Sequence, residues 1–340
     1  MRPDSIAALA KQDEKSRRVP HGWVTPRTET PGKSGWREGR ILALLSILVT
    51  FLLVFHAAVP NTLGRLGSLL ETFLPWLGLT VPGLLALAFL RRSFVALIAL
   101  LLPVVAWMSL FGGLLLPSHD PAGELTALQH NVSDENPDPA ATARVLIRAQ
   151  ADLVALEELT PSALPAFAAA MASDYPHHAT RGTVGLWSKY PLSDVRLVDI
   201  RPEGVGDGWN RGLRATATTA QGDVAVYVAH LPSVRLGLGN GFSSERRDES
   251  AVLLGEAIAA ERLEKVILLG DLNSTVDDRG LAPVSSQMNA AGSGFAFSWP
   301  AALPMARIDQ IMARSAEVTD VWSLPATGSD HLPIAAHVRL

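Results

Sequence analysis

Three long apolar runs divide the chain into a polar N-terminal part and a large C-terminal part. The runs are Ile41–Val59, Leu69–Leu90 and Phe94–Leu116. The first and third contain no Asp, Glu, Lys or Arg, and the second contains only Glu71, close to its start. About 20 consecutive apolar residues span the hydrocarbon core of a bilayer. The pattern therefore predicts three transmembrane helices, at about 41–59, 69–90 and 94–116.

Basic residues around these runs predict an orientation. Residues 1–40 contain nine Lys/Arg and five Asp/Glu, are rich in Pro, Gly, Ser and Thr, and have no apolar period, which predicts a disordered basic tail. Arg91 and Arg92 lie between the second and third runs, and Arg65 alone lies between the first and second. Because basic residues concentrate on the cytoplasmic side, we expect a multi-pass cell-membrane protein with its N-terminus in the cytoplasm and residues 117–340 outside. A cleaved signal peptide fits less well, since 40 residues precede the first run and no small-residue cleavage site follows it.

From residue 117 onward, short apolar runs alternate with helical patterns, which is typical of an α/β domain. The expected strands lie at 124–132, 152–159, 182–192, 213–231 (a hairpin), 265–274, 305–314 and 329–338. The expected helices lie at 137–151, 161–175 and 243–263. No glycine fingerprint of a dinucleotide fold and no phosphate loop occurs.

Composition narrows the chemistry. The chain has no cysteine, which excludes disulfides, thiolate metal sites and a cysteine nucleophile. Residues 117–340 hold 17 Lys/Arg against 27 Asp/Glu, an acidic excess of ten. Since a protein that binds a polyanion needs cationic surface, nucleic acid is not the expected substrate. Arg211, Arg235 and Arg246 can still bind one or two phosphate groups.

Polar side chains gather where the expected strands end or begin. Glu158 and Asp330 offer hard oxygen ligands, which suit Mg²⁺ or Mn²⁺ better than zinc. Asp271 and Asn273 stand two residues apart at the end of one apolar strand, so we expect them on the same side.

Seven motifs occur in an order that resembles the endonuclease/exonuclease/phosphatase superfamily over about residues 125–340. They are QHNV, DLVALEEL, GLWSKYPL, VAHL, GDLNS, RIDQIMA and SDHLPI. The resemblance implies a DNase I-like four-layer α/β sandwich, in which two mixed sheets pack face to face between helices and the site lies at one end of the sheets. The three apolar runs resemble the actinobacterial membrane-bound branch that includes the VanJ-type teicoplanin-resistance proteins.

The resemblance also implies roles for single residues. The metal ligands would be Asn131, Glu158 and Asp330. The catalytic residues would be His230, Asp271, Asn273, Asp309 and His331. In this set Asp309 fixes the tautomer of His331 and raises its basicity, and either Asp271 or the His331–Asp309 pair is the general base. Glu157 stands where the family usually has Gln, and we assign it no role.

The reaction implied is Mg²⁺-dependent hydrolysis of a phosphoric ester or anhydride. A domain held on the outer membrane face has lipid phosphates within reach, so the first hypothesis is a phosphatase acting on a lipid phosphate or pyrophosphate such as undecaprenyl pyrophosphate, with a role in teicoplanin resistance. The alternatives are a membrane-tethered extracellular nuclease and a catalytically silent protein that binds a cell-wall precursor or drug. No protein partner is implied. The loop at 232–244, with Leu236, Leu238 and Phe242, either dips into a lipid surface or packs on the domain.

Overall fold

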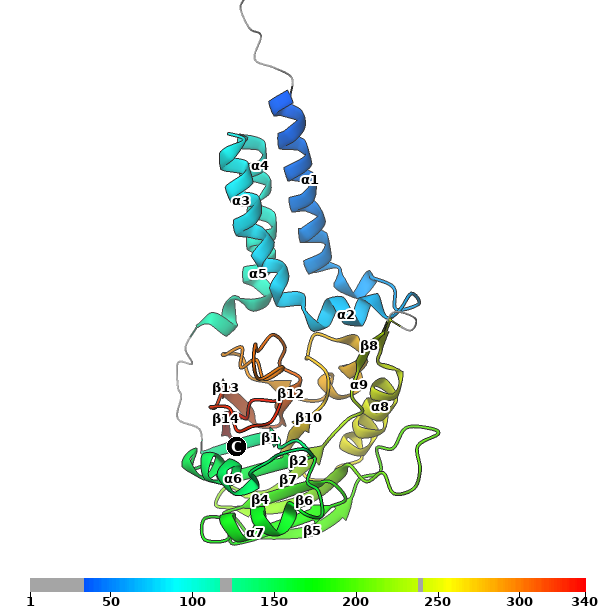
Figure 1. Cartoon of the computed structure of the whole chain (residues 1–340), viewed down its shortest axis with the longest axis vertical. Coiled ribbons are helices and arrows are strands. Elements are labelled where there is room, and N and C mark those ends of the chain that lie inside the picture. Colours follow the sequence, from blue (N-terminus) through cyan, green and yellow to red (C-terminus); the bar gives the residue numbers. More distant parts are fainter. Residues whose placement is uncertain (1–33, 117–123, 238–240) are drawn as a thin grey trace, which may run out of the picture.

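A computed structural model describes residues 34–116, 124–237 and 241–340 (Figure 1). A column of helices from the N-terminal part stands on an α/β domain built from the rest of the chain. Residues 1–33 of the predicted tail, the expected domain start at Pro117 and Leu238 of the loop lie outside the described residues.

Two six-stranded mixed sheets form the centre of the domain. The first has the order β13 (Glu317–Ser323), β14 (Ile334–Arg339), β1 (Leu125–Asn131), β2 (Leu153–Glu157), β4 (Val184–Ser188), β3 (His177–Arg181). The second has the order β11 (Asn289–Ala290), β12 (Asp309–Arg314), β10 (Val266–Asp271), β7 (Gly222–Ala229), β6 (Gly212–Thr219), β5 (Leu192–Leu197). Their facing side chains, such as Leu125 and Ala127 on one sheet and Val226 and Leu269 on the other, form one fully buried apolar cluster. The two sheets therefore pack face to face.

Helices cover both outer faces of the sheets. Leu146 of α6 (Pro139–Arg148) and Phe167 of α7 (Leu164–Met171) pack on the first sheet. Leu254 of α8 (Glu245–Ala259) and Val284 of α9 (Ala282–Ser285) pack on the second, next to the short turn η4 (Arg279–Leu281). The α/β part of the fold prediction, two mixed sheets flanked by helices, is confirmed.

The strands that the apolar pattern did not predict lie at sheet edges. β3 and β13 are the edges of the first sheet, and β5 and β11 are the edges of the second. No residue of β5 is buried: each is exposed or intermediate in burial. The strand therefore shows no apolar run in the sequence. A separate hairpin, β8 (Arg235–Gly237) with β9 (Gly241–Ser243), lies beside α8.

The N-terminal column is made of α1 (Ser34–Val54), α3 (Thr80–Leu90), α4 (Phe94–Ala99) and α5 (Leu101–Phe111). Short turns η1 (His56–Ala58), η2 (Leu74–Leu79) and η3 (Gly112–Leu115) and the helix α2 (Leu66–Thr72) connect it to the domain. α1 begins seven residues before the predicted start of the first span, so the described end of the predicted tail, 34–40, is helical.

The second predicted span, 69–90, is not one helix. α2 and the helical stretch Leu74–Leu90 meet at a bend of 72°. Pro75, within the first two residues of η2, has no N–H to continue the hydrogen bonds of α2, which explains the break. α2 consequently lies across the base of the column, against the domain (Figure 1).

By length and composition, one helix of the described chain can cross a bilayer, namely Phe94–Leu115, with 22 residues. The bent pair would add a second if it counts as one span, and the apolar part of α1, Gly39–Val54, is shorter. Many apolar side chains of the column are exposed, among them Leu44 (65%), Leu90 (77%) and Phe94 (73%).

Candidate active site

The strand order brings the polar strand ends to one edge of the sandwich. β1 runs parallel to β2, with Asn131 opposite Glu157 in the register. β10 runs antiparallel to β12, with Asp271 opposite Asp309. His331 lies just before β14, the antiparallel neighbour of β1. Residues that are up to 200 positions apart in the chain therefore meet at one place.

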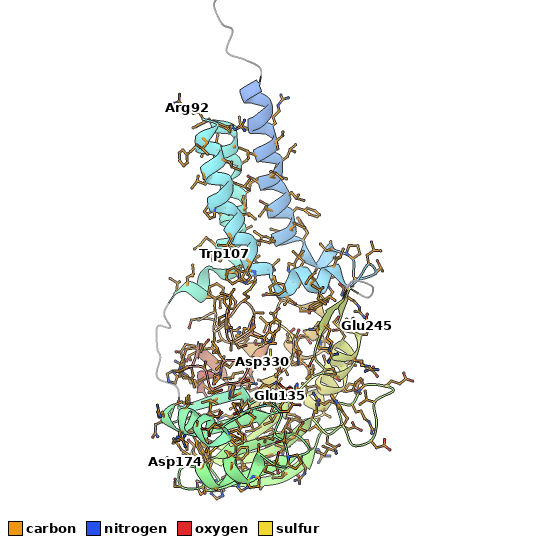
Figure 2. The ribbon with its side chains drawn as sticks, in the orientation of Figure 1. Arg92, Trp107, Glu135, Asp174, Glu245 and Asp330 are labelled. Atoms are coloured by element: carbon orange, nitrogen blue, oxygen red, sulfur yellow. The ribbon has the colours of Figure 1, made fainter. Side chains whose placement is uncertain are left out.

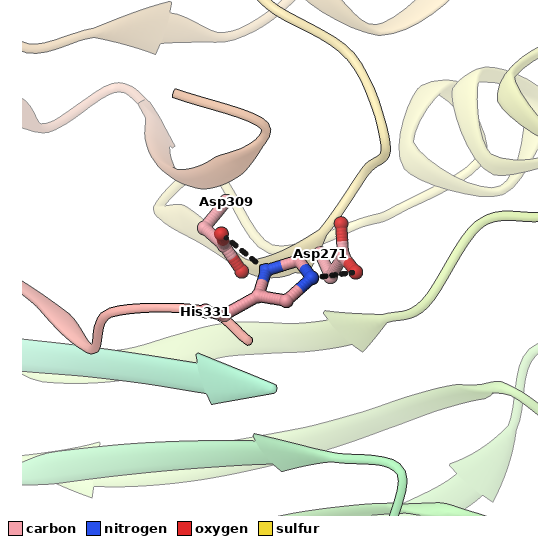
Figure 3. Close-up of side chains that lie close together, drawn as sticks. All are labelled: Asp271, Asp309 and His331. Carbon is pink, nitrogen blue, oxygen red and sulfur yellow. Dashed lines mark hydrogen bonds and ion pairs between the residues drawn. The ribbon is translucent and has the colours of Figure 1, made fainter. Parts of the chain in front are cut away.

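A cluster of two carboxylates and one imidazole forms the centre of this edge (Figure 3). Nδ1 of His331 lies 2.8 Å from Oδ2 of Asp309, and Nε2 lies 3.8 Å from Oδ2 of Asp271. One ligand atom from each of the three lies within 4.8 Å of the others. All three side chains are buried. The predicted His331–Asp309 pair is present, and its imidazole points its second nitrogen at Asp271.

Burial and charge shift the protonation of this cluster in opposite directions. Burial lowers the pKa of His331, but the charges of Asp309 and Asp271 outweigh it and raise that pKa to about 10. Burial raises the pKa of Asp271 to about 7, with a further contribution from Asp309. Burial raises the pKa of Asp309, but the charge of His331 and its hydrogen bond outweigh this effect. The pKa of Asp309 therefore lies below its ordinary value. An imidazolium beside an acid that titrates near neutrality can move protons.

Two amides surround Asp271, although not in the way that strand alternation predicts. Nδ2 of Asn131 donates to Oδ2 of Asp271 at 3.0 Å, and the backbone N–H of Asn273 donates to Oδ1 at 2.9 Å. Asn273 lies outside β10 in a left-handed conformation, with φ of 47°. A tight turn, and not a shared strand face, places Asp271 and Asn273 together.

His230 lies behind this cluster, directly after β7. Its Nε2 is 3.7 Å from Oδ2 of Asp271 and 3.8 Å from Oε1 of Glu158, and Nη1 of Arg211 lies 3.2 Å from its Nδ1. Burial, and next the charge of Arg211, lower the pKa of His230 well below its ordinary value. His230 is therefore neutral and able to accept a hydrogen bond.

A cavity of about 340 Å³ opens above the cluster. Six of the predicted site residues line it, namely Asn131, Glu158, Asp271, Asn273, Asp330 and His331. Asp309 and His230 are not part of the lining but lie next to residues that are: Asp309 is 2.8 Å from His331, and His230 is 3.7 Å from Asp271. The eight predicted catalytic and metal-binding residues thus gather around one cavity.

The three predicted substrate-binding arginines line a neighbouring cleft of about 990 Å³. Arg211, Arg235 and Arg246 come from three different elements, and the cleft shares Ser233 and Leu236 with the cavity. An anion held by these guanidinium groups would therefore lie next to the catalytic cluster.

The motifs did not point to Gln129 and Glu157, which lie below the cluster. Nε2 of Gln129 donates to Oε2 of Glu157 at 2.8 Å and to Oδ1 of Asp309 at 3.0 Å. Glu157 is fully buried, and burial together with the charges of Asp309 and Asp271 raises its pKa well above the ordinary value. Glu157 is thus a neutral acid in the support of the cluster. The signal in the sequence was Gln129, a polar residue on the face of β1 that carries Leu125 and Ala127.

The donor groups fit a hard divalent cation. Glu158, Asp330 and Asp271 offer carboxylate oxygens and Asn131 an amide oxygen around one cavity, without a sulfur ligand. The side chain of Glu158 is 26% exposed and Asp330 is exposed, so both can reach an ion that enters from solvent.

Comparisons with known proteins agree with this arrangement. The sequence profile described as "Endonuclease/Exonuclease/phosphatase family" matches residues 128–331, which is 204 of 340 residues. No curated protein matches the chain. The crystal structure of D. rerio TDP2 complexed with single strand DNA product aligns with a TM-score of 0.53 at 17% identity, covering 64% of this chain and 99% of that chain. A functionally unknown conserved protein from Enterococcus faecalis V583 aligns with a TM-score of 0.50 at 16% identity, covering 63% and 99%. These similarities concern the fold of the α/β domain.

Proposed function

The chain belongs to the endonuclease/exonuclease/phosphatase family, whose members are phosphoester hydrolases, and we propose that it removes phosphate from a lipid phosphate or pyrophosphate at the outer face of the cytoplasmic membrane. One observation carries the proposal: the Asp271, Asp309 and His331 cluster opens on a cavity that it shares with Glu158 and Asp330. With a pyrophosphate, water attacks the terminal phosphorus and the bond to the bridging oxygen breaks. The products are the lipid monophosphate and inorganic phosphate.

Glu158, Asp330 and Asn131 would hold a divalent ion, for which we propose Mg²⁺, with Mn²⁺ as a substitute. When bound, such an ion neutralises phosphate charge and stabilises the charge that develops during attack. Asp330 comes from the loop before β14, and Glu158 directly follows β2. The strands on both sides of β1 would therefore contribute ligands.

Protons are handled by Asp271 and His331. Asp309 fixes the imidazole through Nδ1 and directs Nε2 toward Asp271 and the cavity. Either the Asp271 carboxylate or His331 in its neutral form takes the proton of the attacking water, and the other group stabilises the charge that results. The pH–rate profile of Asp309→Asn separates the two assignments, because this change lowers the basicity of the imidazole and leaves the Asp271 carboxylate in place.

Neutral donors and arginines would hold the phosphate oxygens. Asn273 uses one amide N–H for the carbonyl of Leu231, at 3.0 Å, which leaves its second N–H for a ligand. His230 lies next to Arg211, whose Nη1 is 3.2 Å from its Nδ1. A second phosphate group of a pyrophosphate would lie toward the arginine cleft.

Membrane attachment through three spans, with a cytoplasmic N-terminus, is part of the proposal. Its support is the apolar exposed surface of the column and the place of Arg92 at the tip of the column farthest from Asp330 (Figure 2). Trp107, at the base of the column, lies where an indole ring would meet the membrane interface. In this orientation the catalytic domain lies outside, where undecaprenyl pyrophosphate is exposed after cell-wall synthesis. Release of carrier lipid there would raise tolerance to glycopeptides such as teicoplanin.

A membrane-tethered nuclease or other phosphodiesterase is the second candidate, favoured by the arginine cleft. The acidic excess of the domain opposes it, because a polyanion binds through several cationic contacts.

The test uses the purified full-length protein in detergent with Mg²⁺. Undecaprenyl pyrophosphate, a phosphodiester lipid and plasmid DNA are offered separately to the wild type, Asp271→Ala and His331→Ala. We expect phosphate release from the pyrophosphate and its loss in both variants. His337→Ala is the matched control, since His337 lies 2.9 Å from Asp320 in an imidazole–carboxylate pair away from the cavity.

Two results would contradict the proposal. Phosphate release that survives both active-site substitutions would show that the site is elsewhere. DNA nicking without lipid turnover would favour the nuclease.

A further inference from the structure

Part of the catalytic cavity is not made by the α/β domain. Leu69 and Thr72 of α2 and Phe73, which follows it, line the same cavity as Asp271 and His331. These three residues belong to the connection between α1 and α3, on the N-terminal side of the family domain. We call residues 66–73 the roof segment.

The roof segment is fixed to the domain by a buried carboxylate. Glu71 is fully buried, and both of its oxygens accept hydrogen bonds from Arg279, whose Nη2 and Nε lie 2.8 Å and 2.9 Å away. The backbone N–H of Arg279 adds a third bond, at 3.0 Å. Nη1 and Nη2 of the same arginine also donate to the carbonyls of Val59 and His56, both at 2.9 Å. One guanidinium therefore binds both ends of the connection that carries the roof.

The β8–β9 hairpin holds the other side of this connection. The backbone N–H of Phe242 donates to the carbonyl of Gly64 at 2.8 Å. A Cβ at Gly241, where φ is 65°, would lie 2.3 Å from that carbonyl oxygen, so this contact requires glycine. Arg65 bonds Glu245 and Asp248 at 3.0 and 2.9 Å. The roof and the hairpin thus form one structure above the cavity.

The cavity is lined by two kinds of side chain. Besides the six site residues described above, its lining includes the large apolar side chains of Leu69, Phe73, Leu236, Phe242, Trp299 and Ile308. Water alone would solvate these apolar side chains poorly, whereas a hydrocarbon group attached to the bound phosphate would contact them.

We infer that the roof segment selects the substrate: Phe73 and Leu69 bind the first carbons of the hydrocarbon chain that carries the phosphate. The inference rests on the proposed function and adds to it the part of the site that recognises the lipid. The membrane-proximal connection is then a specificity element as well as a tether, and a short water-soluble phosphate ester lacks the group that it binds.

The first experiment compares two pyrophosphates with the same head group, methyl pyrophosphate with one carbon and farnesyl pyrophosphate with fifteen. Full-length protein in lipid nanodiscs with Mg²⁺ is assayed for phosphate release as the wild type, as Phe73→Ala and as Leu66→Ala. Leu66 is the matched control, because it lies at the other end of the roof segment from Phe73, is 50% exposed and does not line the cavity. We expect Phe73→Ala to lower kcat/KM for the farnesyl compound about tenfold through KM, and to leave kcat/KM for the methyl compound unchanged.

The second experiment measures binding without turnover. Octylphosphonate and methylphosphonate, which have no ester bond to hydrolyse, are titrated calorimetrically into the same three proteins. We expect octylphosphonate to bind about tenfold tighter than methylphosphonate to the wild type and to Leu66→Ala, and this preference to be lost in Phe73→Ala. Leu69→Ala provides an independent test at the second roof position if Phe73→Ala does not fold.

The two experiments separate failure of the inference from failure of the function. If the wild type, Phe73→Ala and Leu69→Ala all prefer octylphosphonate over methylphosphonate by the same factor, the inference is overturned, even if the pyrophosphates are hydrolysed. Loss of the octylphosphonate preference in the roof variants, in a protein that releases no phosphate from either pyrophosphate, would support the roof and contradict the proposed activity.

Discussion

Replacing Arg279 by alanine tests whether the buried carboxylate of Glu71 holds the roof segment in place. In the wild type, five side-chain hydrogen bonds between 2.8 and 3.1 Å join Arg279 to Glu71, Val59 and His56. The Glu71 side chain has no exposed surface, whereas that of Arg279 is 29% exposed. Arg279→Ala therefore removes the guanidinium from a buried carboxylate whose remaining partners are Nδ1 of His56, 3.0 Å away, and the backbone N–H of residue 279.

The magnitude follows from this asymmetry. Removing one partner of a buried ion pair costs roughly 3–5 kcal/mol when the other charge stays buried without compensation. Because His56 stays beside Glu71, we expect the lower end of this range. We expect most of that cost to appear as local opening, since residues 56–76 are a connection between helices and not part of either sheet. An opening free energy reduced by roughly 3 kcal/mol corresponds to about a hundredfold faster exchange of the amides in the segment.

Hydrogen exchange followed by mass spectrometry measures this effect in the full-length protein. Peptides that cover residues 63–79 should exchange faster in Arg279→Ala, while peptides from β1 and β10 should not change. Arg201→Ala is the control, because Arg201 lies 2.6 Å from Asp207, which is fully exposed, and an exposed pair of this kind contributes about 0–1 kcal/mol.

A double replacement identifies the cause. In Glu71→Leu/Arg279→Leu no buried charge remains, so exchange of the segment should return most of the way to the wild-type rate. The reasoning is refuted if Arg279→Ala leaves exchange at the rate of the Arg201→Ala control, or if the double variant opens as readily as the single one.

Three further predictions concern the site and the domain. Asp309→Asn should lower kcat at least a hundredfold, whereas the control Asp320→Asn should leave kcat unchanged; equal effects in a phosphate-release assay would count against the proposed pair. Glu158→Gln should raise the Mg²⁺ concentration needed for half-maximal activity about tenfold or more, and calorimetric Mg²⁺ binding that is unaffected would exclude Glu158 as a ligand. Glu261 is bonded to Arg214 at 2.9 Å in a buried pair: burial raises its pKa, but the hydrogen bonds outweigh this and lower it to about 2. Because this folded pKa lies below the ordinary value of 4.5, the carboxylate stabilises the fold above about pH 4.5 and loses that contribution as the pH falls toward about 2, a change on the order of 3 kcal/mol. Acid unfolding monitored by circular dichroism should be less steep in Glu261→Gln than in the control Glu256→Gln.

The central strands could be predicted from the sequence because each buries both faces. β1, β2, β7 and β10 are short apolar runs flanked by polar residues, and their order along the chain placed His230 and Asp271 at strand ends. The edge strand β3 was missed, since only its middle residue, Ala179, is buried. A run of apolar residues indicates a buried strand. An edge strand such as β3 buries few residues, so its sequence contains no such run.

Contacts between distant segments were not predictable in the same way. Gln129 and Glu157 support Asp309 through bonds that span 28 and 180 residues. Nothing local to Glu71 indicates Arg279, which lies 208 residues later. In the sequence, Glu71 is a single charge near the start of an expected membrane span. In the structure, its carboxylate attaches α2 to Arg279 of the catalytic domain.

The position of Glu71 also changes how the anchor would sit in a bilayer. Once α2 is part of the domain surface, only Leu74–Leu90 remains for the second span. Its six 3-10 residues at about 2.0 Å each and eleven α-helical residues at about 1.5 Å each reach about 28 Å. This is about 2 Å short of the roughly 30 Å hydrocarbon core. A short span is accommodated by local thinning of the bilayer or by drawing the flanking residues into the interface. On the proposed topology the flanking residues are those of the roof segment, so the mismatch would pull Leu69 and Phe73 toward the depth at which lipid phosphates lie. A tether of full length would leave the cavity farther from its substrate, which gives the shortened second span a direct part in the proposed reaction.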